Sequence, residues 1–147
     1  MVAVIGIGAI GGVVAARLAR RGEPGLLLCS RRAQEALRVE APDGSFQVRA
    51  PVRTSPVGLT PVDWVLLAVK SHQTAAAADW LRALCGPQTT VAILQNGVEH
   101  VERVRPFARD AALLPVVIRC SAERRADGSI TQRAPALFTT PDSAAGR

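Results

Sequence analysis

The chain has 147 residues, enough for one domain with a substantial core and too few for two ordinary domains. Hydrophobic residues make up 48% of it, and no apolar run approaches the ~20 residues that a membrane span needs. The net charge of +6 raises the question of nucleic-acid binding, but the arginines are scattered and only 3% of residues are aromatic, too few for base stacking. We therefore expect neither a membrane protein nor a nucleic-acid-binding protein.

The start of the chain and its cysteines favour a cytoplasmic protein. The apolar residues from Met1 to Ile7 have no basic region before them and lead directly into glycines, so we expect no signal peptide. The three cysteines, Cys29, Cys85 and Cys120, are odd in number and lack the spacing of metal ligands. We interpret them as reduced thiols and expect no metal site.

The first 29 residues have the pattern of a strand, a helix and a second strand. Val2 to Ile5 is a short β-branched run that predicts a buried strand. Apolar residues then recur every four positions over a predicted helix from Ile10 to Arg21, and Gly22 stands where a helix commonly ends. Leu26 to Cys29 predicts the next strand. This is the length of one βαβ unit.

The rest of the chain continues the alternation of strands and helices. Asp43-Gly44 predicts a hairpin over Val39 to Val48, and Ala126-Asp127-Gly128 predicts a second hairpin into Ser129 to Gln132. The other predicted elements are strands at Trp64–Val69, Thr89–Leu94 and Leu113–Ile118, and helices at Thr74–Leu84 and Val98–Val104. This order predicts one doubly wound α/β domain over residues 1–147, with a mostly parallel sheet and added hairpins. Ligands bind such sheets at the carboxyl ends of the strands.

A glycine motif follows the first predicted strand. Gly6-Ile7-Gly8-Ala9-Ile10-Gly11 has the form G-x-G-x-x-G and opens the first helix, which is the context that a dinucleotide site requires. Gly6 would permit a tight turn, Gly8 would let a pyrophosphate approach the backbone, and Gly11 would let the helix pack closely on the strand. The motif predicts a Rossmann-type site, the alternative being a glycine turn without a ligand.

The end of the second strand indicates which dinucleotide is bound. NAD sites usually carry an acidic residue there for the ribose 2′-hydroxyl, but this chain has Ser30-Arg31-Arg32. Arginine offers a planar pair of donors that suits a phosphate. We therefore predict NADP(H), with Arg31 at its 2′-phosphate. A solvated basic loop without a ligand is the alternative.

Two further strand ends carry polar residues that suit a ligand. Lys70 ends the predicted strand Trp64–Val69 and is the only lysine among 18 basic residues. Its ammonium could donate to a carbonyl or ribose oxygen. Gln95-Asn96-Gly97 ends the next strand, and the Asn96 amide can both donate and accept. We predict that Lys70 and Asn96 line one cleft, although a surface lysine and a plain Asn-Gly turn are the simpler readings.

Taken together, these residues resemble the ketopantoate reductase family, whose N-terminal domain aligns with essentially the whole chain. The glycine motif alone is shared by many enzymes, whereas its combination with the lysine and Asn-Gly elements is more specific. The matching segments are Val4 to Gly11, Arg31, Asp63 to Lys70, Gln73-Thr74 and Leu94 to Gly97.

The resemblance implies a reaction and a set of roles. Members of the family reduce 2-dehydropantoate to pantoate with NADPH, in coenzyme A biosynthesis. By similarity, Gly6 to Gly11 hold the pyrophosphate, Arg31 holds the 2′-phosphate, and Lys70 and Asn96 act near the nicotinamide and the 2-oxo acid. The segment Ser121-Ala122-Glu123 is expected to approach the nicotinamide, with Glu123 counted among the cofactor-binding residues.

The resemblance also implies a second domain, which is found in members of the family and is not contained in these 147 residues. The family has a C-terminal helical domain that provides a catalytic lysine, its acidic partner and most substrate contacts, and this chain has no second lysine. We expect the chain to be the cofactor-binding half, truncated before that domain and inactive alone. A non-catalytic NADP-binding module and a reductase of another 2-oxo acid remain as alternatives, and a homo-oligomer is compatible with either.

Overall fold

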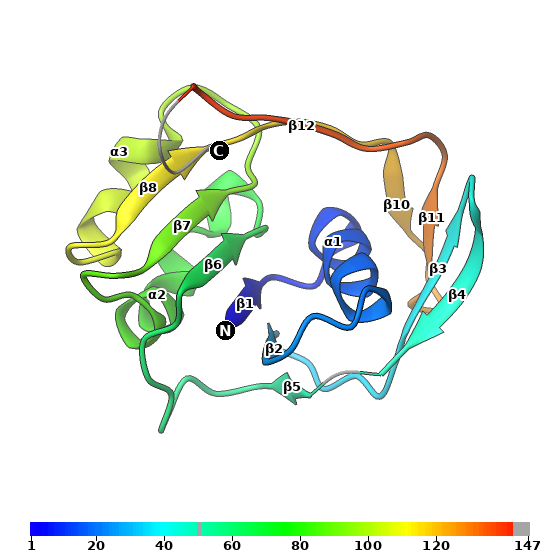
Figure 1. Cartoon of the computed structure of the whole chain (residues 1–147), viewed down its shortest axis with the longest axis horizontal. Helices are drawn as coiled ribbons and strands as arrows, with labels where there is room; N and C mark the ends of the chain where they lie inside the picture. Colours follow the sequence, from blue (N-terminus) through cyan, green and yellow to red (C-terminus); the bar gives the residue numbers. More distant parts are fainter. Residues whose placement is uncertain (50, 143–147) are drawn as a thin grey trace.

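A parallel sheet forms the centre of the protein (Figure 1). The computed structural model describes residues 1–49 and 51–142. Within them, the central sheet has the strand order β5-β2-β1-β6-β7-β8, and all neighbours pair in parallel. These strands are β1 (Val2–Ile5), β2 (Leu26–Cys29), β5 (Val52–Arg53), β6 (Trp64–Leu67), β7 (Thr90–Ile93) and β8 (Ala112–Pro115). Numbered along the chain, this is the 3-2-1-4-5-6 order of the Rossmann fold, which confirms the predicted fold class.

Helices cover both faces of this sheet, which is why its strands are apolar on both sides. Helix α1 (Ala9–Arg20) lies on one face, and α2 (Ala78–Leu84) and α3 (His100–Val104) lie on the other (Figure 1). Successive residues of β1 serve the two cores in turn, because Val4 packs on the α1 side and Ala3 and Ile5 on the other side. All three are buried.

A second sheet covers α1 from the side away from the central sheet (Figure 1). Its strands have the order β10-β11-β3-β4, with bounds β3 (Leu37–Ala41), β4 (Gly44–Val48), β10 (Ala122–Arg124) and β11 (Ile130–Gln132). Both predicted hairpins are confirmed here, since β3 pairs with β4 and β10 pairs with β11, each antiparallel. Helix α1 thus lies between the two sheets, and the β10–β11 hairpin of the second sheet lines the same cavity as the glycine loop at the start of α1.

The strand predicted over Leu113–Ile118 is wrong as a single element. Its first part is β8, at the edge of the central sheet, and its second part is β9 (Val117–Arg119), which pairs antiparallel with β12 (Leu137–Thr139). Pro115 ends β8 and has no N–H group to donate, so it suits a strand edge where pairing stops. The chain then leaves the central sheet.

The helix predicted over Thr74–Leu84 is regular only in its second half. Two 3₁₀ turns, η1 (Ser71–Gln73) and η2 (Ala75–Ala77), precede α2. The hydroxyl of Thr74 donates to the carbonyl of Ser71 at 2.9 Å, and Thr74 also bonds to Gln95 of another loop. These bonds hold the segment in a tighter turn than its alanines alone would adopt. The predicted helix Val98–Val104 likewise begins only at His100 and continues as a 3₁₀ turn, η3 (Arg105–Phe107).

The prediction for α1 is confirmed, including its end. Gly22 has φ +76° and donates to the carbonyl of Ala19 at 3.0 Å, while Glu23 donates to that of Leu18 at 3.1 Å. These two bonds form the Schellman motif that commonly ends a helix at glycine. Among the described helices, none combines the length and apolar character needed to cross a membrane.

Candidate functional site

The glycine loop joins β1 to α1 at the carboxyl edge of the central sheet. Gly6 has φ +94°, and its N–H donates to the carbonyl of Cys29 at 3.0 Å, which ties the loop to the end of β2. A Cβ at Gly11 would lie 1.9 Å from the carbonyl oxygen of Gly6, so only glycine lets the helix pack this closely. A Cβ at Gly8 would meet nothing within 4 Å. The first and third glycines therefore serve packing, and the middle one faces open space.

The start of α1 can receive an anion. Gly8 caps the helix without a side-chain hydrogen bond, and the first turn contains no acidic residue. The first N–H groups of a helix have no partner within the helix, and its dipole favours negative charge there. A phosphate lying over Gly8 would meet both conditions.

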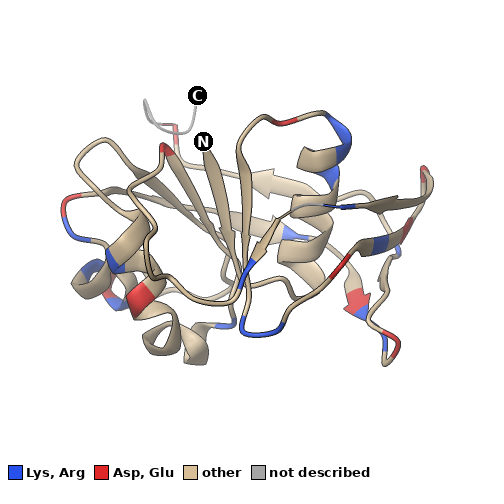
Figure 2. Ribbon diagram, turned by 90° about the horizontal axis from the view of Figure 1, so that it is seen from below, with Lys and Arg blue, Asp and Glu red and all other residues tan. Residues whose placement is uncertain are grey.

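A cavity of about 1030 Å³ lies over this loop and the ends of β1, β2 and β6. It is lined by residues of the glycine loop from Gly6 to Ile10, by the segment after β2, by the segment after β6 and by the β10–β11 hairpin. Five of the lining residues are basic, namely Arg31, Arg32, Lys70, Arg124 and Arg125, and none of the described lining residues is acidic. Figure 2 shows basic residues on loops at the lower edge of the sheet, where β1 ends. This charge suits a ligand with several phosphates.

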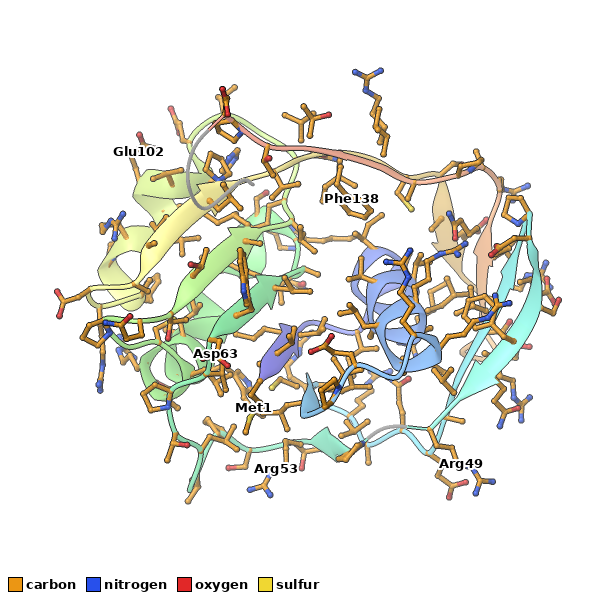
Figure 3. All side chains as sticks on the ribbon, viewed as in Figure 1. Met1, Arg49, Arg53, Asp63, Glu102 and Phe138 are labelled. Carbon is orange, nitrogen blue, oxygen red and sulfur yellow. The ribbon has the colours of Figure 1, made fainter. Side chains whose placement is uncertain are left out.

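A second cavity, of about 650 Å³, has a different character. It lies between α1 and the strands β6, β7 and β8, and apolar side chains such as Leu66, Leu94 and Leu114 line it. Phe138 of β12 points into the same space (Figure 3). No residue of the glycine loop lines this groove, and it offers few donors to phosphates, so we assign the candidate site to the first cavity.

The segment after β2 brings two arginines into the first cavity. Arg31 and Arg32 are both exposed, and the N–H of Arg32 donates to the hydroxyl of Ser30 at 3.2 Å. Cys29 lies beneath them, and burial raises the pKa of its thiol to about 12, so the thiol is neutral. The end of β2 therefore carries positive charge alone, as the sequence predicted.

Lys70 lines the cavity from the end of β6, and a buried glutamine holds its loop in place. The amide nitrogen of Gln95 donates to the carbonyl of Val69 at 3.0 Å and to the hydroxyl of Thr74 at 3.1 Å. Gln95 is only 3% exposed. It thus joins the end of β7 to the loop that carries Lys70. This role of Gln95 was not predicted, although a polar residue directly after a buried strand was a usable signal.

Asn96 and Glu123, unlike Lys70, are not among the residues that line the cavity. Asn96 is exposed and follows β7, the neighbour of β6 in the sheet. Glu123 is exposed on β10, and its carboxylate pairs with Arg133 at 3.1 Å. Its neighbours Ala122 and Arg124 do line the cavity. The roles predicted for Asn96 and Glu123 stay predictions.

Arg124 is the residue that sequence reasoning did not identify. Its guanidinium donates to the carbonyl of Ile7 in the glycine loop. The contact depends on the packing of the second sheet against α1, which joins positions 117 residues apart and leaves no local pattern in the sequence.

No metal site is evident in residues 1–49 and 51–142, because no three His, Cys, Asp or Glu side chains are grouped closely enough there to hold an ion.

Comparison with known proteins agrees with this geometry. The family model for ketopantoate reductase PanE/ApbA matches residues 2–144. The chain belongs to the ketopantoate reductase family. Among curated members, a 2-dehydropantoate 2-reductase of Caulobacter vibrioides is 47% identical over 148 residues, covering 99% of this chain and 50% of that protein. A 2-dehydropantoate 2-reductase of Mycobacterium tuberculosis is 43% identical, covering 95% of this chain and 48% of that protein.

Solved ketopantoate reductases share the fold. The crystal structure of a PanE/ApbA family ketopantoate reductase from Ralstonia eutropha superposes with a TM-score of 0.82 at 26% identity, covering 99% of this chain and 50% of that one. This chain therefore spans about half the length of the ketopantoate reductases it matches. The region shared with them is the Rossmann-type domain described above.

Proposed function

We propose that this chain is the cofactor-binding half of an NADPH-dependent reductase of a 2-oxo acid, with 2-dehydropantoate as the first substrate to consider. Membership of the ketopantoate reductase family and the names of the curated relatives support the reaction. The assignment of the cofactor rests on the cavity over the glycine loop. Among the described residues that line it, five are basic and none is acidic.

Two separate groups of residues would bind the phosphates of the dinucleotide, one at the start of α1 and the other at the end of β2. The pyrophosphate would lie over Gly8 and accept from the free N–H groups at the start of α1. Arg31, at the end of β2, would bind the 2′-phosphate that distinguishes NADPH from NADH. NADPH, when bound, supplies the hydride, and the protein orients it and excludes competing reactions.

Lys70 and Asn96 are proposed to act at the nicotinamide end of the dinucleotide, near the 2-oxo acid. Lys70 lines the same cavity from the end of β6, so its ammonium can donate to an oxygen of the nicotinamide ribose or of the 2-oxo acid. Asn96 follows the adjacent strand β7 and offers both a donor and an acceptor. Glu123 lies one residue before Arg124 and is proposed to approach the nicotinamide only if its pairing with Arg133 opens.

The cysteines support the proposal of a cytoplasmic protein. All three are free thiols, and burial raises the pKa of Cys29 and Cys85 to about 12 and about 11. Free thiols are typical of a reducing compartment. Formation of a homo-oligomer stays a prediction.

Replacement of Arg31 tests the cofactor assignment. A hydrogen bond to a charged group is worth ~1.5–3 kcal/mol, so Arg31→Ala should weaken NADPH binding by roughly 10- to 150-fold. NADH lacks the 2′-phosphate and should bind equally to both proteins. Isothermal titration with each dinucleotide makes the measurement.

Arg119→Ala is the matched control, because Arg119 is exposed on β9 outside the cavity and its loss changes the net charge equally. An Arg31→Ala protein that binds NADPH as tightly as the wild type would contradict the assignment.

A further inference from the structure

Arg124 reaches from the end of β10 to the glycine loop. Its guanidinium donates a hydrogen bond to the carbonyl oxygen of Ile7, which lies between the first two glycines of the motif. The same side chain lines the cavity over the loop. It is carried there by the second sheet, whose strands β10 and β11 pack on α1. The β10–β11 hairpin therefore supplies a cation directly beside the segment that the pyrophosphate would approach.

The charge of Arg124 has no balancing carboxylate among the described residues. Its neighbours on the second sheet are already paired, Arg125 with Glu40 at 3.0 Å and Arg133 with Glu123 at 3.1 Å. The bond to Ile7 uses one donor and meets a neutral carbonyl. A guanidinium has five N–H donors, so most of those on Arg124 are available to a ligand.

We propose that Arg124 binds the pyrophosphate of the dinucleotide, together with the glycine loop. This inference rests on the proposed dinucleotide site. A guanidinium that is hydrogen-bonded to Ile7 lies within reach of phosphate oxygens over Gly8, and arginine can bind such oxygens through two parallel bonds. Arg31, at the end of β2, is assigned to the 2′-phosphate instead. Two arginines from different sheets thus divide the phosphates of one ligand.

Because the two arginines would bind different phosphates, replacing each of them should weaken a different set of ligands. The pyrophosphate is common to NADPH and NADH, so Arg124→Ala should weaken both by the same factor, roughly 10- to 150-fold. Adenosine 2′-monophosphate carries the 2′-phosphate without a pyrophosphate, and its binding should change by less than about two-fold. Arg31→Ala should show the opposite pattern, with NADPH and adenosine 2′-monophosphate weakened and NADH unchanged.

The experiment is isothermal titration of NADPH, NADH and adenosine 2′-monophosphate into the wild type, Arg124→Ala, Arg124→Lys and Arg119→Ala. Arg124→Lys keeps the charge but not the planar pair of donors, so it should recover only part of the affinity. It also provides a testable protein if Arg124→Ala does not fold. Arg119→Ala should match the wild type for all three ligands.

Three results would overturn the inference while leaving the proposed function standing. Unchanged affinity of Arg124→Ala for both dinucleotides would show that the residue does not contact the ligand. Loss of NADPH binding alone would assign Arg124 to the 2′-phosphate. Equal weakening of adenosine 2′-monophosphate would show that the effect of Arg124 is not specific to the pyrophosphate. Failure of the wild type to bind either dinucleotide would instead remove the proposed function itself.

Discussion

At the scale of single residues, the loop that carries Lys70 depends on one buried amide. Gln95 donates to the Val69 carbonyl and the Thr74 hydroxyl, so it fixes the two sides of the loop after β6. Lys70 itself is exposed at the end of β6 and lines the cavity. Gln95 therefore fixes the backbone from which the Lys70 side chain extends into the cavity.

Gln95→Leu should separate this positioning role from general stability. The change leaves a buried carbonyl and hydroxyl without their donor, which costs ~1–3 kcal/mol and should lower the denaturant midpoint. It should also weaken NADPH, because the wall of the cavity that carries Lys70 would loosen. Gln88→Leu is the control, since Gln88 is exposed before β7. Equal stability of the two variants would contradict the role given to Gln95.

At the scale of elements, an ion pair ties α1 to the second sheet. The guanidinium of Arg17 binds both carboxylate oxygens of Asp43, at 2.9 and 3.0 Å, and also the side-chain oxygen of Gln132 at 2.8 Å. The hydrogen bond from Arg17 lowers the pKa of Asp43 below its usual value. The turn between β3 and β4 is thereby fixed to the helix that begins at the glycine loop.

The lowered pKa of Asp43 predicts a pH-dependent contribution to stability. A carboxyl whose pKa is lower in the folded state stabilises the fold fully above its usual pKa, and this contribution is lost as the pH falls through the folded value. Asp43→Asn should therefore have a lower Tm than the wild type near pH 7, and the difference should shrink in acid. Asp110→Asn, at an exposed site, is the control. A Tm difference that is constant down to acidic pH would contradict the assignment.

The elements also show what the sequence can and cannot predict. Periodicity and turn residues predicted α1, the strands at β1, β2, β6 and β7 and both hairpins, because those signals are local. The division of Leu113–Ile118 into β8 and β9 depends on pairing with β12, and the 3₁₀ turns before α2 depend on Thr74 and Gln95. The lining residues Arg31 and Lys70 follow strands and were predictable, whereas Arg124 reaches the site through packing of distant elements.

At the scale of the whole molecule, the two cavities differ in chemical character and are lined by different parts of the chain. One is basic and opens over the glycine loop, and the other is apolar and lies between α1 and β6 to β8, beside Phe138 (Figure 3). The chain matches about half the length of ketopantoate reductases, and the residues described here include the glycine loop and the basic cavity over it. Cofactor binding is therefore the property that we propose to measure on these 147 residues.

The most direct test of the account is the affinity of the unmodified chain for the two dinucleotides. Titration of NADPH and of NADH into the purified protein at the same low ionic strength compares them, and salt must be matched because it screens charged contacts. We predict that NADPH binds at least about 10-fold more tightly, since one charged hydrogen bond to the 2′-phosphate gives that ratio. Equal affinities, or no binding of either dinucleotide, would contradict the account.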